Sequence, residues 1–192
     1  MRTKLLACVV FFFTVLLSAA VDTEAQGRSL VIESFDVTVK VAESGRIDVL
    51  ESLRFRFSGS WNGVYRLIPV NYGTAQGFNY KLYLDVESIT DESGRPLEYK
   101  DTRERHYRKL KVWVPGAQNT TRTIHFRYSV PNALRFFDSA DGGFTEGRDE
   151  LYWNVTGDEW EIPIERASAR VELPPRVTGL QARAFTGAFR ST

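Results

Sequence analysis

The amino-acid sequence predicts an all-β protein: an antiparallel β-sandwich of immunoglobulin-like architecture, without a disulfide and preceded by a signal peptide. Apolar and polar residues alternate with a period of two over many short runs, which is typical of strands with one buried face. Turn signals rich in Gly, Ser and Pro separate these runs. No long window shows an apolar stripe at helical spacing. The length of 192 residues favours a single domain.

The N-terminus has the layout of an export signal. Two cations precede the apolar run 5–17, and small residues then offer cleavage sites after Ala20 or after Ala25. The run is shorter than the ~20 apolar residues that span a bilayer, so we favour a cleaved signal peptide over a transmembrane helix. Residues 1–25 are therefore predicted to be removed on export, with Cys8 among them.

A long hairpin is the first element expected after the signal. Val37, Val39 and Val41 alternate with polar residues, and a turn follows at 43–46. Alternate positions over 47–57 continue the pattern, with Glu51 standing among them.

Further alternation predicts strands at 82–86, 110–114, 124–130, 151–153 and 167–173, with turns between them and prolines at several ends. The Cys…Trp…Cys core of true immunoglobulin domains is absent, so "immunoglobulin-like" describes the architecture alone.

The composition excludes several classes of function. Lys and Arg number 25 against 24 Asp and Glu without a basic run, which argues against nucleic acid as a partner. One Cys and two His cannot form a Cys/His zinc site. A nucleophile elbow and a phosphate-binding glycine loop are both missing. The sequence thus predicts neither catalytic residues nor a cofactor.

An acidic loop is the best candidate for a metal site. Asp138, Asp141, Glu146 and Asp149 supply the oxygen ligands that Ca²⁺ requires. Their spacing does not match an EF-hand loop, and neighbouring arginines can neutralise the charge, so a solvated loop is the alternative.

A second acidic group surrounds a tryptophan. Asp158, Glu159 and Glu161 beside Trp160 are the residue types of glycoside hydrolysis. Adjacent side chains point to opposite faces of an extended chain, so a catalytic pair needs a further carboxylate from elsewhere. A loop with Trp160 packed into the core is the alternative.

Basic residues cluster between 103 and 111: Arg103, Arg105, Arg108, Lys109 and Lys111. A charged strand edge that discourages self-pairing accounts for them. Contact with an anionic lipid or a cell-wall polymer is the alternative.

Three stretches carry a family resemblance: 34–57, NGVYRLIPV at 62–70, and 142–174. Together they resemble the DUF2207 family, a domain of unknown function in predicted membrane proteins, over residues 29–187. The Tyr-Arg-x-Ile-Pro turn, followed later by Glu-Leu-x-Trp-Asn and Trp-x-x-Pro-Ile, is the specific part of the pattern.

The resemblance implies an extracytoplasmic β-rich domain of a bacterial envelope protein, followed in relatives by transmembrane helices, and it implies no catalytic residue set. Membrane attachment and a protein or cell-envelope partner are expected on this basis. Residues 188–192 form a short tail, and a secreted form and a truncated chain are the two interpretations of it.

The physical roles of the shared motifs follow from their residue types. Gly63 is expected to take a positive φ in a tight turn. Arg66 is expected to clamp a carboxylate of the later segment, namely Glu150, Asp158 or Glu161, as a structural lock between two halves of the sandwich.

A recognition site made of Tyr65, Arg66, Trp153 and Trp160, with Glu161 beside them, is the alternative, because exposed aromatics and Arg form binding hot spots. The sequence therefore predicts a non-catalytic extracytoplasmic interaction module. A carbohydrate-active domain using segment 153–161 is the second hypothesis.

Overall fold

The computed structural model describes residues 27–73, 79–138 and 147–184, and the predicted signal peptide lies outside them. Strands and no helix occur in these residues, so the all-β prediction is confirmed. The described part of the chain accordingly contains no helix that could cross a membrane. The strands are β1 (Ser29–Val41), β2 (Ile47–Ser60), β3 (Gly63–Pro69), β4 (Asn71–Gly73), β5 (Asn79–Lys81), β6 (Asp85–Asp91), β7 (Tyr99–Glu104), β8 (Tyr107–Trp113), β9 (Gln118–Val130), β10 (Leu134–Phe137), β11 (Arg148–Leu151) and β12 (Ala167–Glu172).

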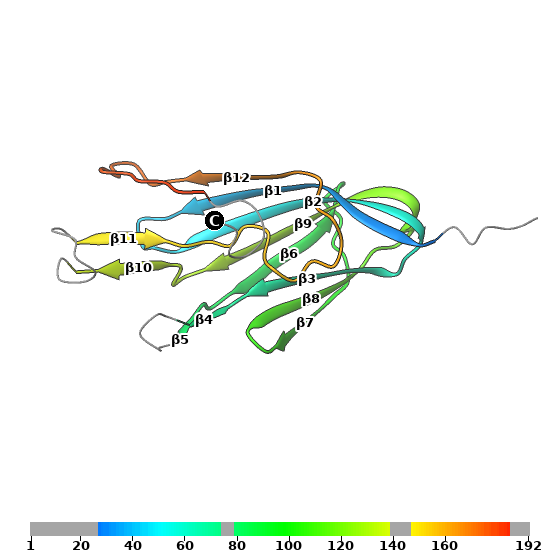
Figure 1. Cartoon of the computed structure of the whole chain (residues 1–192), viewed down its shortest axis with the longest axis horizontal. Helices are drawn as coiled ribbons and strands as arrows, with labels where there is room; N and C mark the ends of the chain where they lie inside the picture. Colours follow the sequence, from blue (N-terminus) through cyan, green and yellow to red (C-terminus); the bar gives the residue numbers. More distant parts are fainter. Residues whose placement is uncertain (1–26, 74–78, 139–146, 185–192) are drawn as a thin grey trace, which may run out of the picture.

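Two main sheets organise these strands (Figure 1). The large sheet has five strands in the order β12-β1-β2-β9-β6, and the small sheet has three in the order β3-β8-β7. The hairpins β4–β5 and β10–β11 pair separately.

The hairpin of β1 and β2 forms as its alternation predicts. Val39 lies opposite Val49 and Val41 opposite Ile47. Gly45 turns the chain between them with φ of +82°, a backbone conformation that costs glycine little. Strand β2 then pairs along nearly its whole length with β9, so the first hairpin forms the middle of the large sheet.

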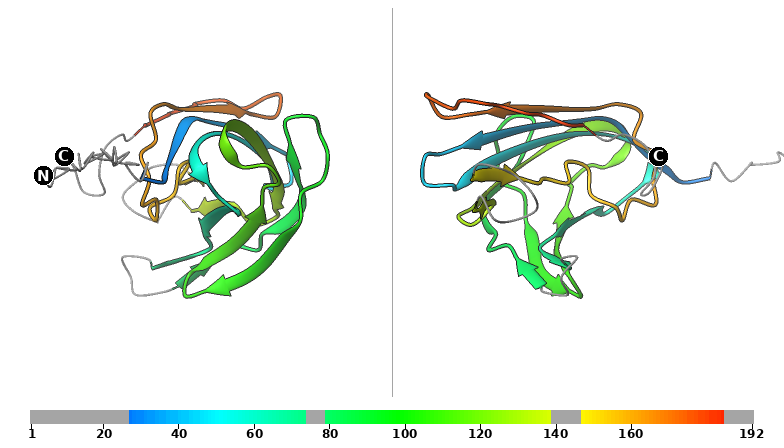
Figure 2. Two further views of the ribbon diagram at one scale, coloured as in Figure 1. Left: turned by 90° about the vertical axis from the view of Figure 1, so that its right-hand side faces the viewer. Right: turned by 60° about the vertical axis from the view of Figure 1, so that its left-hand side comes forward.

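The apolar faces of the two sheets share one core (Figure 2). Alternate residues of β1, β2 and β9 point into it, and so do alternate residues of β3 and β8. Its fully buried members from the large sheet are Ile32, Phe35, Ile47, Leu53, Phe55, Ile124, Tyr128 and Val130, and those from the small sheet are Leu110 and Val112.

Strand β12 departs from the predicted antiparallel arrangement because it runs parallel to β1. The chain reaches β12 by a long irregular connection and not by a hairpin, and only such a connection brings a strand back in the parallel sense. All six residues of β12 are exposed, so the alternation at 167–173 marks an edge strand and not a core strand.

Two other predicted strands have different boundaries. Leu82 and Leu84 are buried, but they belong to the connection before β6, which begins at Asp85. Strand β11 ends at Leu151, before Trp153. Burial in a loop produced the same period-two pattern as a strand, since the pattern records burial and not pairing.

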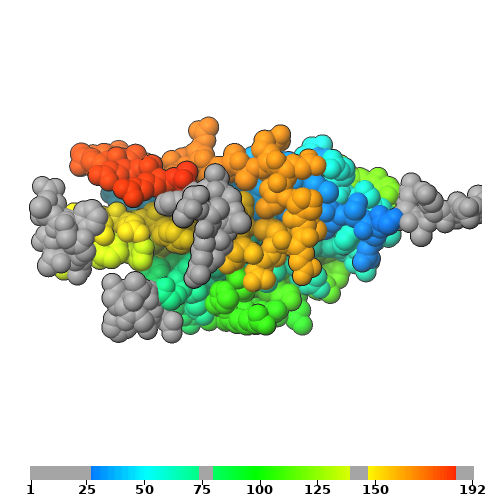
Figure 3. Space-filling view, in the orientation of Figure 1, coloured from blue at the N-terminus to red at the C-terminus, as the bar shows by residue number. Residues whose placement is uncertain are grey.

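The connection from β11 to β12, residues 152–166, leads from the β10–β11 hairpin to the edge of the large sheet and is called the crossing segment below. It is the orange trace in front of the sheets in Figure 1, and in Figure 3 its atoms lie between the large and small sheets. Backbone hydrogen bonds fix its end to β1: Ile32 donates to the carbonyl of Pro163 at 3.0 Å, and Phe35 donates to that of Arg166 at 2.9 Å.

Candidate functional site

A buried ion pair joins the two sheets. Alternation in β3 turns Arg66 inward together with Val64 and Ile68, and alternation in β2 does the same for Glu51. The arginine side chain is 1% exposed and the glutamate 0%. Arg66 Nε donates to one carboxylate oxygen and Nη2 to the other, both at 2.8 Å, which is the bidentate geometry of a strong charged pair.

The remaining donors of Arg66 reach the crossing segment. Nη1 donates to the carbonyl oxygens of Thr156 at 3.0 Å and of Leu67 at 2.8 Å, and Nη2 lies 3.4 Å from that of Val155. One guanidinium therefore connects the large sheet, the small sheet and the crossing segment. Five donors in a rigid plane allow this, and a lysine could not reproduce it.

A tyrosine completes the polar cluster. The hydroxyl of Tyr128, on β9, donates to Glu51 at 2.6 Å. Burial raises the pKa of this hydroxyl well above its ordinary value, and the charge of Glu51 raises it further. Burial also disfavours the charge of Arg66, but the attraction and hydrogen bonds of Glu51 outweigh it and raise the pKa of the arginine. These shifts favour a charged guanidinium and a neutral phenol in the cluster.

Aromatic rings enclose the guanidinium. Its carbon lies 5.2 Å from the ring centre of Phe35 and 5.7 Å from that of Trp160. Trp160 packs edge-on against Phe35, and its indole nitrogen donates to the carbonyl of Thr156 at 2.6 Å. Gly157 adopts φ of +80°, and a Cβ there would lie 2.8 Å from Arg66 Nη1. The crossing segment is therefore fitted closely around this cluster.

The predicted partners of Arg66 were wrong, because none of the three candidate carboxylates pairs with it. Glu150 pairs with Arg135, Asp158 accepts a hydrogen bond from Tyr107, and Glu161 is exposed. The partner is Glu51, and the later segment contributes backbone carbonyls instead. The sequence held a signal for this: Glu51 is an acidic residue at a core-facing position of an otherwise apolar alternation.

The five residues of the predicted motif do not lie on one surface. Tyr65 precedes Arg66 on a strand, so it faces outward and is 48% exposed, while Arg66 is sealed. Trp153 and Trp160 are half-buried and pack against the core, Trp153 tilted over Tyr128 at 6.2 Å. Glu161 is exposed on the crossing segment. The structure thus brings Arg66 and Trp160 together, places Trp153 against Tyr128 and separates all of them from Tyr65.

The second acidic group meets a tyrosine of the small sheet. Tyr107 is 4% exposed, and its hydroxyl lies 3.1 Å from a carboxylate oxygen of Asp158 and 3.0 Å from one of Glu159. Burial raises the pKa of Tyr107, and the hydrogen bonds to the two carboxylates raise it further. These acids therefore fasten the crossing segment to β8.

The acidic loop is described only in part. Asp138 and Asp149 are exposed, while Asp141 and Glu146 lie outside the described residues. In the parts of the chain that are described, no three His, Cys, Asp or Glu side chains gather in a way that could hold a metal ion.

Gly63 serves a different purpose from the one expected. Its φ is not positive. A Cβ at this position would lie 1.9 Å from the carbonyl oxygen of Val112 on β8, so glycine is needed for the close approach of two strands.

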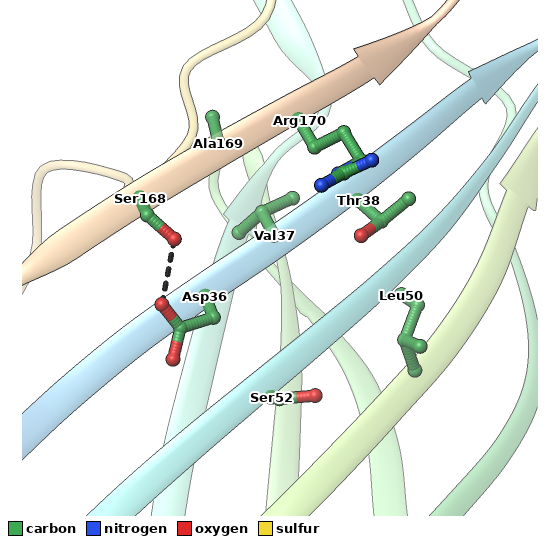
Figure 4. A pocket seen from close by; sticks show the side chains of 8 residues that line it. All are labelled: Asp36, Val37, Thr38, Leu50, Ser52, Ser168, Ala169 and Arg170. Carbon is green, nitrogen blue, oxygen red and sulfur yellow. Dashed lines mark hydrogen bonds between the residues drawn. The ribbon is translucent and has the colours of Figure 1, made fainter.

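An open hollow of about 340 Å³ lies where β12, β1 and β2 run side by side (Figure 4). Figure 4 shows Arg170 extending over β1 toward Thr38, while Ser168 donates to Asp36 at 2.6 Å. Leu50 and Ser52 border it on β2. The lining mixes single charges of both signs with small hydroxyls and contains no pair of carboxylates.

Comparison with solved structures places the fold beside one domain of larger proteins. Native yeast LTA4 hydrolase matches with a TM-score of 0.51 and 13% identity, covering 76% of this chain and 23% of that chain. The same yeast enzyme in complex with bestatin gives 0.50 and 12%, with the same coverage. An M1 zinc metallopeptidase from Deinococcus radiodurans gives 0.39 and 14%, covering 55% of this chain and 21% of that chain. This chain spans less than a quarter of the length of these proteins, and the likeness concerns the fold alone.

No curated protein matches the chain. A family model does match, over residues 31–191, and it describes the N-terminal domain of a predicted membrane protein. The match covers the hairpin, the crossing segment, the buried Arg66–Glu51 pair and the Tyr-Arg-x-Ile-Pro motif, which was predicted as a turn and lies on strand β3. This protein belongs to the DUF2207 family, whose N-terminal domain it contains.

Proposed function

We propose that the chain is a non-catalytic, extracytoplasmic interaction domain of a membrane-associated envelope protein, built as a β-sandwich. One observation carries the proposal: Arg66 of the Tyr-Arg-x-Ile-Pro motif and its partner Glu51 are 1% and 0% exposed and use their hydrogen-bonding capacity inside the protein. Groups sealed in this way cannot contact a substrate.

The acids that suggested glycan chemistry support the same proposal. Asp158 and Glu159 accept hydrogen bonds from Tyr107, and Trp160 uses both its ring and its nitrogen on core partners. A sugar platform needs an open tryptophan face, whereas the guanidinium carbon of Arg66 lies over this ring, 5.7 Å from its centre.

The described residues expose several large aromatic side chains, some on strands and others on connections. Tyr65, Tyr83, Tyr99, Phe136 and Tyr152 are each more than a third exposed. Tyrosines at surfaces provide apolar area with a polar tip, which suits them to binding. Interaction through such side chains fits a family described as predicted membrane proteins.

The test is the fate of the protein in cells. We expect an intact mass that lacks residues 1–20 or 1–25, recovery in the envelope fraction, and digestion by protease added outside the cytoplasmic membrane. A product that keeps Met1 and is protected from protease in intact spheroplasts contradicts the export part of the proposal.

A second assay addresses catalysis. Purified protein is incubated with cell-wall glycan and the release of reducing ends is measured. We expect none above a boiled control. Release that disappears in Glu159→Gln but persists in Glu161→Gln would establish a hydrolase and overturn the non-catalytic assignment.

A further inference from the structure

The outward face of the small sheet combines lysines with aromatic rings. Strand alternation turns Tyr65 of β3, Lys109, Lys111 and Trp113 of β8, and Lys100 of β7 to the same side, opposite to the buried Leu110 and Val112. In the pairing register Tyr65, Lys111 and Lys100 form one row across the three strands. These five outward residues are called the basic face.

Protection of a sheet edge does not account for the basic face. Charged residues on an edge strand discourage pairing with another chain, which explains cations on β7. Lys109 and Lys111 lie on β8, however, which is the central strand of the small sheet and has partners on both sides. Protection of a strand edge, which the sequence suggested for the basic residues between 103 and 111, therefore explains Arg103. It does not explain Lys109 and Lys111.

The arrangement is also unfavourable for the isolated domain. Lys100 and Lys111 stand directly opposite each other on neighbouring strands, and like charges in that position destabilise a sheet. Among the described residues, Glu104 is the acid that pairs with the face, at 2.6 Å from Lys109. An excess positive charge that costs stability points to a negatively charged partner.

Aromatic rings lie directly beneath the ammonium groups. Lys109 Nζ is 5.0 Å from the ring centre of Tyr65, and Lys111 Nζ is 4.8 Å from that of Trp113. The turn between β7 and β8 adds Arg105, which holds φ of +55° and is exposed. Tyr and Trp settle at the headgroup level of a bilayer, and Lys and Arg are attracted to anionic headgroups.

We propose that the basic face docks the domain onto an anionic lipid surface. The inference deepens the proposed function and rests on it for the location of the domain. Two arguments select a bilayer as the partner: the cations and rings lie on the surface of a sheet and not in a groove that would follow a polymer strand, and the family consists of predicted membrane proteins, so a membrane is within reach.

The expected effect follows from the number of lysines. A cation close to an anionic membrane adds about 1 kcal/mol of attraction, or about fivefold in the partition coefficient. Removing three lysine charges therefore lowers partitioning by about 100-fold. Salt screens exposed charges, so added salt also lowers it.

The experiment is co-sedimentation of the purified protein with vesicles. One set contains phosphatidylcholine alone and the other an equal mixture of phosphatidylcholine and phosphatidylglycerol. The test variant is K100Q/K109Q/K111Q. The matched control is K40Q/R127Q/R170Q, which loses the same charge from exposed positions on the outward side of the large sheet. Thermal melting confirms that both variants are folded.

We expect binding to the anionic vesicles, loss of binding in the basic-face variant, and near-normal binding in the control. Absence of binding by the unmodified protein overturns the proposal. So does an equal loss in both variants, which would reflect net charge alone, and so does binding to a soluble polyanion such as heparin without binding to vesicles.

The vesicle assay and the cellular assay fail independently. If the protein binds anionic vesicles but stays in the cytoplasm, the lipid-docking proposal stands and the proposed function is contradicted. If the protein is exported but does not bind the vesicles, the proposed function stands and the lipid-docking proposal is contradicted.

Discussion

Replacing Arg66 by methionine removes the guanidinium that joins both sheets to the crossing segment and leaves a side chain of similar length. Glu51 would then remain 0% exposed without its cation, accepting a hydrogen bond from Tyr128 alone. The carboxylate must either stay charged in an apolar interior or take up a proton, and both are costly.

The expected loss of unfolding free energy is large. Removing one partner of a buried ion pair costs about 3–5 kcal/mol. The carbonyls of Val155 and Thr156 also lose a donor, but these residues are half-buried and water can replace it, so they add little. We therefore expect R66M to lose about 4 kcal/mol of the roughly 5–15 kcal/mol that stabilises a domain.

The assay is urea unfolding followed by tryptophan fluorescence, arranged as a double-mutant cycle with E51L. Each single variant leaves one buried charge without its partner. The double variant R66M/E51L leaves none, so we expect it to lose about 2 kcal/mol, well below the sum of the two single losses. R54M is the matched control: Arg54 is 54% exposed and bonded to Glu33, and such a pair contributes under about 1 kcal/mol.

Two results would refute this reasoning. A loss below about 1 kcal/mol for R66M, similar to that of R54M, would mean that the buried pair does not hold the sheets together. Single losses that simply add in the double variant would mean that Arg66 and Glu51 act independently. If R66M does not fold, a folded double variant still confirms the coupling, and an unfolded one contradicts it.

Further predictions concern other close contacts. Gly157→Ala combines a φ of +80° with a Cβ only 2.8 Å from Arg66, so we expect a loss of about 2 kcal/mol and faster proteolysis of the crossing segment; an unchanged urea midpoint would be evidence against that fit. Gly63→Ala places a Cβ 1.9 Å from a carbonyl oxygen of β8 and should lower the melting temperature, while Gly73→Ala, with open space around it, should not; equal effects would contradict the close approach. Hydrogen bonds from Ser93 and Arg95 lower the pKa of Asp91, so its contribution to stability is present above the unfolded value of 3.8 and is lost as the pH falls below it. Asp91→Asn should reduce the fall of the melting temperature as the pH drops below 3.8, and an unchanged pH dependence would exclude this role.

Local alternation was sufficient to predict much of the secondary structure. Strands β1, β2 and β9 alternate over most of their length, because one face of each is buried and the other meets solvent, and their prediction is confirmed. The motif with Tyr65 and Arg66 was predicted as a turn, but it forms strand β3 and its two side chains face opposite sides. Alternation failed at Leu82 and Leu84, where a buried loop produces the pattern of a strand.

The partner of Arg66 required the tertiary structure. Alternation along 47–57 put Glu51 among core-facing residues, but it did not predict strand β3, which turns Arg66 inward, or which sheets face each other. Only the packing of the large sheet on the small sheet brings the two side chains within 2.8 Å. Recognising the basic face also required the tertiary structure, since only the strand order β3-β8-β7 shows that Lys109 and Lys111 lie on a central strand and not on an edge.

The sequence by itself determined the all-β class, the alternating strands and membership of a family, because each depends on residues close together along the chain. Strand order, the parallel pairing of β12 with β1 and the Arg66–Glu51 pair were decided by the tertiary structure alone. The physical reason is that a period of two assigns side chains to faces, whereas the neighbours of a strand depend on which arrangement buries those faces together and satisfies the charged groups among them.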